Sequence, residues 1–157
     1  MLVPLLLAAA AAHTSALPPS RTAGKAVTAC LAVTRSDVQL ALGRAVGKPE
    51  AEASATSATC DYAAGRGRVT ITLQHLDRDP DIATEITVLE REIEGARARP
   101  APGFGPQAFF LDIANAGVQL HVIRGRDYLM VSALGFGEAP QVSPAVAQMA
   151  RAAMARW

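Results

Sequence analysis

Apolar and polar residues alternate most clearly over residues 68–76. Val69, Ile71 and Leu73 fall on one face of an extended chain, and polar side chains fall on the other. One apolar and one polar face are typical of a strand in an antiparallel sheet that is covered on one side. A second extended stretch, residues 57–63, precedes it across a glycine-bounded turn, so the pattern predicts a β-hairpin.

Three further extended stretches follow one another in the second half of the chain, at residues 109–114, 118–124 and 128–134. Short turns at Gly117 and Gly125 separate them, and each stretch has the period of two that strands require. Hairpins with such short turns join antiparallel neighbours. We therefore expect these three strands to form a meander.

The stretch between Asp79 and Gly95 has the period of a helix. Asp79 is expected to cap this helix, Pro80 to occupy its first position and Gly95 to end it. Its apolar stripe consists of Ile82, Ile86, Leu89 and Ile93. Together with the strands, this pattern predicts a core that contains Ile71, Leu73, Ile86, Leu89, Leu120, Val122 and Val131.

Two other helices are expected near the ends of the domain. Thr34 and Asp37 have the spacing of a capping box and predict a helix that ends at Gly43. The Ser-Pro pair at 143–144 marks the expected start of a final helix. The polar residues 44–56, which follow the first helix, are expected to form a surface loop.

The expected order of elements is α-β-β-α-β-β-β-α. Because most connections between strands are short hairpins, the strands should pair antiparallel, and the helices need a sheet face to cover. The sequence therefore predicts an α+β fold, with an antiparallel sheet of about five strands and the helices packed on one face.

The beginning of the chain has the pattern of a secretory signal peptide. Residues 2–12 are an unbroken apolar run, and residues 14–16 are small, as at a signal-peptidase site. The run is too short to span a bilayer, although the positively charged region that usually precedes it is missing. No later segment approaches the apolar length of about 18 residues that a membrane span requires. We expect a signal peptide at 1–16, a flexible leader at 17–29 and a single domain at 30–157, in a periplasmic or secreted protein with no transmembrane segment.

Composition narrows the functions that this domain could have. Hydrophobic residues make up 50% of the chain but aromatic residues only 4%, so few rings are available to stack on a ligand. The net charge of +1 excludes strong electrostatic steering towards nucleic acid. Arginine outnumbers lysine 13 to 2, which fits either oxyanion recognition or a GC-rich bacterial genome. We favour the genome, because it also explains the excess of alanine.

Cys30 and Cys60 are the only cysteines of the chain. An oxidising compartment would join them, and a disulfide across about 30 residues would stabilise the fold by roughly 3–4 kcal/mol. Two cysteines with no nearby pair of histidines cannot complete a zinc site. Residues 27–30 also resemble a lipobox, but a lipobox must follow the apolar core directly, and Arg21 and Lys25 intervene. A disulfide is therefore favoured over a lipid-modified Cys30.

A series of short motifs runs through the domain: Cys30-Leu-Ala-Val-Thr, Asp37-Val38, Ala41-Leu42-Gly43, Cys60-Asp-Tyr62 and Gly103-Phe-Gly105. Over residues 30–157 this series resembles uncharacterised small secreted or lipid-anchored bacterial domains, best known from actinobacteria. The resemblance implies an α+β fold and an extracytoplasmic disulfide, and it implies no reaction. The chain departs from the pattern at Phe104, where leucine is usual, and it lacks the sequence context of a lipobox.

Asp77, Asp79 and Asp81 have the spacing of a calcium-binding loop. A full EF-hand loop needs glycine at position 6 and glutamate at position 12, but Ile82 and Val88 stand there. The simpler interpretation is that Asp79 caps the helix and Asp81 meets its positive end. We therefore expect no metal site and no cofactor.

His75 and His121 are the histidines of the predicted domain. A serine-hydrolase triad would need a nucleophile on a strained turn such as G-x-S-x-G, which the chain lacks. His121 lies between Leu120 and Val122 and should point to the opposite face of its strand, as a satisfied or exposed histidine. The sequence therefore designates no catalytic residue.

Two Arg-Gly-Arg turns are the strongest candidate for a binding feature. Arg66 and Arg68 flank one predicted hairpin turn, and Arg124 and Arg126 flank the other. If both turns project from the same end of the sheet, the four guanidinium groups would form an anion-binding rim for a polyanionic ligand or an acidic partner surface. The simpler alternative is that they are solvated turn residues that discourage aggregation at sheet edges.

The sequence favours an exported, non-enzymatic binding or interaction domain for an exported protein or a small ligand. One alternative is an accessory or inhibitor protein that docks on another exported protein, which an exposed apolar patch of several hundred Å² would favour. Another is a small histidine-dependent enzyme, which would need His75 or His121 within hydrogen-bond reach of a carboxylate inside a pocket.

Overall fold

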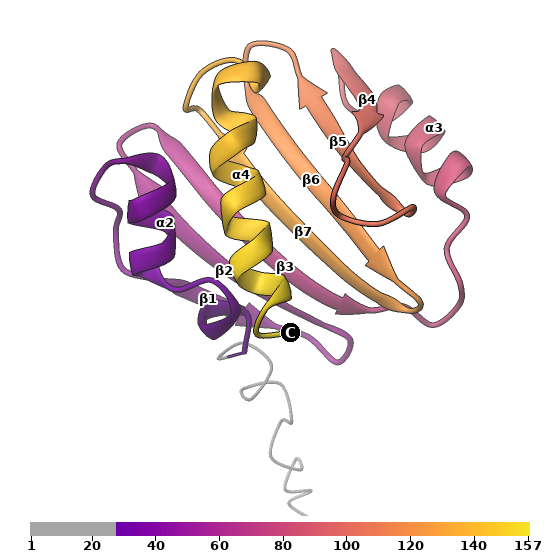
Figure 1. Ribbon diagram of the computed structural model, residues 1–157, viewed down its shortest axis with the longest axis horizontal. Coiled ribbons are helices and arrows are strands. Elements are labelled where there is room, and N and C mark those ends of the chain that lie inside the picture. Colours follow the sequence, from indigo (N-terminus) through magenta and orange to yellow (C-terminus); the bar gives the residue numbers. More distant parts are fainter. Residues whose placement is uncertain (1–27) are drawn as a thin grey trace, which may run out of the picture.

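Seven antiparallel strands form one sheet in the computed structural model, which describes residues 28–157 (Figure 1). Across the sheet they lie in the order β1-β2-β3-β7-β6-β5-β4. In chain order the strands are β1 (Glu50–Ala53), β2 (Ser57–Ala64), β3 (Gly67–His75), β4 (Ala96–Pro100), β5 (Ala108–Ile113), β6 (Gly117–Arg124) and β7 (Asp127–Leu134). The α+β class and the antiparallel sheet are confirmed, but the sheet has seven strands where about five were expected.

The two strands that the sequence did not predict are the edges of the sheet. β1 has the sequence Glu-Ala-Glu-Ala and lies within the expected loop 44–56, whereas β4 has the sequence Ala-Arg-Ala-Arg-Pro. Alanine, proline and most charged residues are depleted in strands, so neither segment carries a propensity signal. Each takes its extended conformation from the strand with which it pairs, β2 or β5.

The larger core lies between the sheet and three helical segments, which are residues 28–32, α2 (Arg35–Leu42) and α4 (Ala139–Met154). Figure 1 shows α4 lying across the middle strands, with α2 beside it. The middle strands contribute aliphatic side chains from every second position, as the alternation predicts. Five of the predicted core residues are buried on this face: Ile71, Leu73, Leu120, Val122 and Val131.

The remaining helix, α3 (Ile82–Glu92), covers the opposite face of the sheet beside β4 and β5. Its apolar stripe packs against Ala96, Phe109 and Leu111, whereas Phe110 belongs to the larger core. Successive side chains of a strand point to opposite faces, so Phe109-Phe110-Leu111 makes β5 apolar on both sides. The expectation that all helices pack on one face was therefore wrong.

The stripe of α3 is less buried than its periodicity suggests. Ile86 and Leu89 pack against the smaller cluster but are only partly buried, and α3 contains no buried residue. A helix that lies at the margin of a sheet contacts strands along only part of its surface, which leaves the rest of its stripe near solvent. The prediction that Ile86 and Leu89 are buried was wrong.

The capping box of α2 is present as predicted. The hydroxyl of Thr34 accepts a hydrogen bond from the backbone N–H of Asp37, and the Asp37 carboxylate accepts one from the backbone N–H of Thr34. Gly43 ends the helix with a φ of 63°, in the left-handed region that glycine adopts at low cost. Local sequence is sufficient to define both ends of this helix.

The other two helices begin elsewhere than predicted. Asp81 is the N-cap of α3 in place of Asp79, so the helix starts two residues later than expected. α4 starts at Ala139, and the Ser-Pro pair at 143–144 lies inside it. Pro140 already supplies a proline in the first turn, which is the position that tolerates one best.

The predicted disulfide joins Cys30 to Cys60, so it ties residues 28–32 to the middle of β2. Beside it, the hydroxyl of Tyr62 donates a hydrogen bond of 2.6 Å to the carbonyl oxygen of Val33. Burial raises the pKa of Tyr62 to about 12, so its hydroxyl remains protonated and remains a donor. The covalent link and the hydrogen bond hold the start of the described chain against the sheet.

No helix within residues 28–157 is long and apolar enough to cross a membrane. The expected signal peptide at 1–16, and nearly all of the expected leader at 17–29, lie outside the described residues.

Matched substitutions of leucine by alanine test the division into a larger and a smaller core. Leu120→Ala should lower the free energy of unfolding by about 2–5 kcal/mol, because Leu120 is fully buried under α4. Leu89→Ala should lower it by about 1–2 kcal/mol, because Leu89 is only partly buried. Denaturant unfolding of both variants measures the difference, and equal losses would contradict this description of the core.

Candidate functional site

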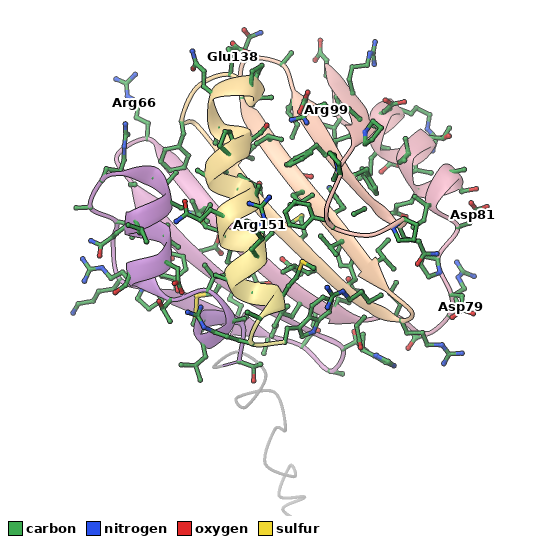
Figure 2. The ribbon with its side chains drawn as sticks, viewed as in Figure 1. Arg66, Asp79, Asp81, Arg99, Glu138 and Arg151 are labelled. Carbon is green, nitrogen blue, oxygen red and sulfur yellow. A yellow bond between two sulfur atoms is a disulfide. The ribbon has the colours of Figure 1, made fainter. Side chains whose placement is uncertain are left out.

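A cleft of about 870 Å³ opens where β3 ends. Its walls come from the last residues of β3, the loop 76–81, the first turn of α3 and the residues Ile123 and Tyr128 beside the β6–β7 turn. Figure 2 shows Asp79 and Asp81 on the loop that leads into α3. The cleft combines charged, polar and aromatic side chains.

The position of the cleft follows from the topology of the sheet. β3 pairs with β7 up to His75 and Asp127, and the N–H of Leu76 still donates to the carbonyl oxygen of Arg126. The chain must then reach α3, which covers β4 and β5 on the face opposite α4. The loop 76–81 therefore crosses from a part of the sheet that no helix covers on this face to the part that α3 covers. The cleft lies between the end of β3 and the start of α3.

Four carboxylates line this cleft: Asp77, Asp79, Asp81 and Glu85. Two of them already have partners. Oδ1 of Asp79 lies 3.5 Å from Nε of Arg126, and Asp81 caps α3. Hydrogen bonds from the side chain and backbone of Thr84 lower the pKa of Asp81, which keeps it ionised. Within residues 28–157 neither Asp77 nor Glu85 forms an ion pair, so both can attract a ligand cation.

His75 and Asp127 form a carboxylate–histidine pair at the margin of the cleft. Nδ1 of His75 lies 2.9 Å from a carboxylate oxygen of Asp127, and the register places the two residues opposite each other on β3 and β7. Both side chains are 57% exposed, so water screens their attraction. Across residues 29–157 no hydroxyl or thiol side chain hydrogen-bonds to His75, so the pair has no nucleophile to activate in this part of the chain.

A buried network of hydrogen-bonded side chains fixes one wall of the cleft. The hydroxyl oxygen of Tyr128 lies 2.7 Å from Nδ1 of His121. On the other side of the same ring, Nε2 of His121 lies 3.1 Å from Oε1 of Gln119. An amide oxygen only accepts, so Nε2 carries the proton and Nδ1 accepts from the tyrosine hydroxyl. The ring of His121 also stacks on Phe109, with centroids 4.5 Å apart. His121 is therefore the satisfied histidine that the sequence allowed, on the face opposite Leu120.

Burial determines the protonation states of His121 and Tyr128 in this network. It lowers the pKa of His121 to about 4, because the imidazolium would lose its hydration. Burial also raises the pKa of Tyr128, and the negative charge of Glu85 raises it further. At neutral pH both groups are uncharged, and together they hold the Tyr128 ring in one orientation against the cleft.

The two Arg-Gly-Arg turns lie at opposite ends of the sheet. Arg68 pairs with Leu134 at one end of the β3–β7 ladder, whereas Arg124 and Asp127 close the β6–β7 turn at the other end. Figure 2 shows Arg66 far from Asp79, the partner of Arg126. The predicted anion-binding rim therefore does not form, because the register of β3 against β7 separates its halves by the full length of a strand.

The three aspartates with calcium-loop spacing do lie together, but their side chains are used differently. Asp79 faces Arg126 and Asp81 caps α3. Among the described residues no group of three or more potential ligands is arranged to hold a metal ion. Asp81, which was expected only near the positive end of the helix, is its N-cap.

Sequence reasoning did not identify Glu85 and Tyr128 as residues of one site. Glu85 lies on the polar side of α3, and Tyr128 is the second residue of β7, more than forty positions later. Only the β3–β7 pairing brings the two segments together, and nothing in the local pattern indicates that pairing. No protein family, curated protein or solved structure matches the chain.

Acid should weaken the fold through His121. Its pKa is about 4 in the folded protein, below the value of about 6.5 of an unfolded chain, so below pH 6.5 the unfolded state binds more protons. The free energy of unfolding should fall by about 2 kcal/mol between pH 8 and pH 5 from this residue alone. Denaturant unfolding across this range measures the fall.

The variant His121→Gln should show a flatter pH dependence of stability than the parent protein. His75→Asn is the matched control, because it removes an exposed histidine and leaves the buried hydrogen-bonded network intact. The same slope in the His121→Gln variant would show that other groups cause the acid sensitivity.

Proposed function

We propose that this chain is an exported, non-enzymatic binding domain that holds a small organic cation in the acid-lined cleft. The observation that supports this proposal is the pair of carboxylates of Asp77 and Glu85, which line the cleft without a cationic partner among residues 28–157. The lining also contains one arginine, Arg78, so its four carboxylates outnumber its cations, whereas the chain as a whole has a net charge of +1.

The walls of the cleft suit a cation that also carries apolar groups. Carboxylates attract an ammonium or guanidinium group, and the face of a tyrosine ring such as that of Tyr128 adds a cation–π contribution. Leu76, Pro80 and Ile123 supply apolar surface to the same cleft.

The buried hydrogen-bonded network behind Tyr128 supports a binding role. A ring that is already held by His121 loses little freedom when a ligand packs against it, so the entropic cost of binding is reduced. The exposed His75–Asp127 pair at the margin of the cleft is placed to contribute a further hydrogen bond, and it lacks a nucleophile within residues 29–157.

Export is proposed on two observations. The disulfide between Cys30 and Cys60 is the kind of link that persists in an oxidising compartment. The apolar run at residues 2–12 has the length of the core of a signal peptide. An accessory protein that docks on another exported protein is the second candidate function, and the free edge of the sheet at β1 favours it.

Calorimetric titration with spermidine, agmatine and choline tests the proposed cleft. At least one of these cations should bind the parent protein, and the double variant Asp77→Asn/Glu85→Gln should weaken that binding by about tenfold or more. Both residues are exposed and neither caps a helix, so the variant should fold normally.

Glu138→Gln is the matched control for this experiment. Glu138 is also an exposed carboxylate, but Figure 2 shows it at the far end of the molecule from Asp79 and Asp81, and its side chain forms no cap hydrogen bond. If binding falls equally in both variants, the net charge of the protein and not the cleft controls the affinity, which would contradict the proposal. Binding by none of the three cations would contradict the proposal of a cation site.

A further inference from the structure

The two edges of the sheet differ in how their backbone groups are satisfied. On β4 the outward groups belong to Ala96, Ala98 and Pro100, because the alternate residues bond to β5. The N–H of Ala96 donates to the carbonyl oxygen of Ile93, and that of Ala98 donates to a carboxylate oxygen of Glu90 at 2.8 Å. Pro100 has no N–H, so no outward N–H of β4 is left for another strand.

Side chains also cover part of the acceptor side of β4. The guanidinium of Arg97 donates to the carbonyl oxygen of Ala96 at 2.8 Å. Glu90, which satisfies Ala98, is fixed on α3, and α3 packs beside this edge. The β4 edge is therefore closed to strand addition, which is how many sheets avoid aggregation.

The β1 edge has no such protection. The N–H of Ser54 donates to the carbonyl oxygen of Ser57, which shows that Glu50, Glu52 and Ser54 are the residues that bond to β2. Ala51 and Ala53 must therefore direct their N–H and C=O groups away from the sheet. No other residue within 28–157 forms a hydrogen bond to these groups, and Figure 1 shows β1 at the margin of the sheet.

The side chains along β1 indicate what kind of strand would fit there. Glu50 and Glu52 are exposed, and they lie on the face opposite the larger core. Ala51 and Ala53 lie on the other face and are small, so they leave room beside them. A strand added to this edge would place its residues opposite the glutamates on one face and opposite the alanines on the other.

A second copy of this chain fits the edge poorly. Antiparallel pairing of two β1 strands would bring the glutamates of one copy opposite those of the other, and like charges across a ladder are destabilising. The β4 edge of another copy carries arginines, but its outward N–H groups are already bonded or absent. The free edge therefore favours a different protein.

We propose that the β1 edge binds an extended segment of another protein in which basic and apolar residues alternate, and that this segment becomes an eighth strand of the sheet. The backbone of Ala51 and Ala53 would supply the hydrogen bonds, and Glu50 and Glu52 would select basic side chains. This site shares none of these residues with the cleft, so it does not depend on the cation site proposed there.

A fluorescent hexapeptide of alternating lysine and valine tests this proposal by anisotropy. It should bind the full domain, and a hexapeptide of alternating glutamate and valine should not. Ala51→Pro should weaken binding by about tenfold or more, because it removes an outward N–H while leaving the bonds to β2 intact. Ala51→Val keeps that N–H and serves as the matched control, with binding close to that of the parent.

Two further variants keep the outcome decisive. Glu50→Lys/Glu52→Lys changes only exposed side chains and should reverse the preference towards the glutamate peptide, even if Ala51→Pro fails to fold. The part of the binding that Ala51→Pro removes should persist in Asp77→Asn/Glu85→Gln. Loss in this cleft variant with retention in the edge variants would place the peptide in the cleft and overturn the proposal. Absence of binding of the lysine peptide to the parent protein would also overturn the proposal.

Discussion

The pairing of β3 with β7 is the constraint on which the rest of this structure depends. It joins a hairpin from the first half of the chain to a meander from the second half, through eight opposed pairs from Arg68↔Leu134 to His75↔Asp127. Bringing together segments so distant in sequence has a large entropic cost, which the continuous core beneath α4 offsets. The same pairing places the loop 76–81 beside the β6–β7 turn and so creates the cleft.

Much of the fold could be predicted because alternation is a local property. The strands that alternate clearly form the middle of the sheet, and the capping box of Thr34 and Asp37 defines α2. The edge strands β1 and β4 could not be found in this way, since pairing and not composition makes them extended. The placement of α3 could have been inferred from Phe109-Phe110-Leu111, where consecutive apolar residues indicate a strand covered on both faces.

The candidate site was less predictable than the fold, because it depends on register. Arg66 and Arg124 occupy equivalent hairpin turns in sequence, yet the ladder places them at opposite ends of the sheet. The cleft combines a loop, a helix and a turn, and its tyrosine is fixed by a histidine seven positions earlier on the neighbouring strand. Spacing along the chain cannot indicate such an arrangement until the order of the strands is known.

Disulfide cross-linking of His75→Cys/Asp127→Cys tests the β3–β7 register most directly. These residues form a non-hydrogen-bonded pair, whose Cα atoms lie about 4.5 Å apart, within the range that a disulfide spans. Peptide mapping after mild oxidation should find positions 75 and 127 joined, with Cys30 still joined to Cys60. The control Arg66→Cys/Asp127→Cys should remain unlinked. Cross-linking in the control, or its absence in the test variant, would contradict the register on which the cleft depends.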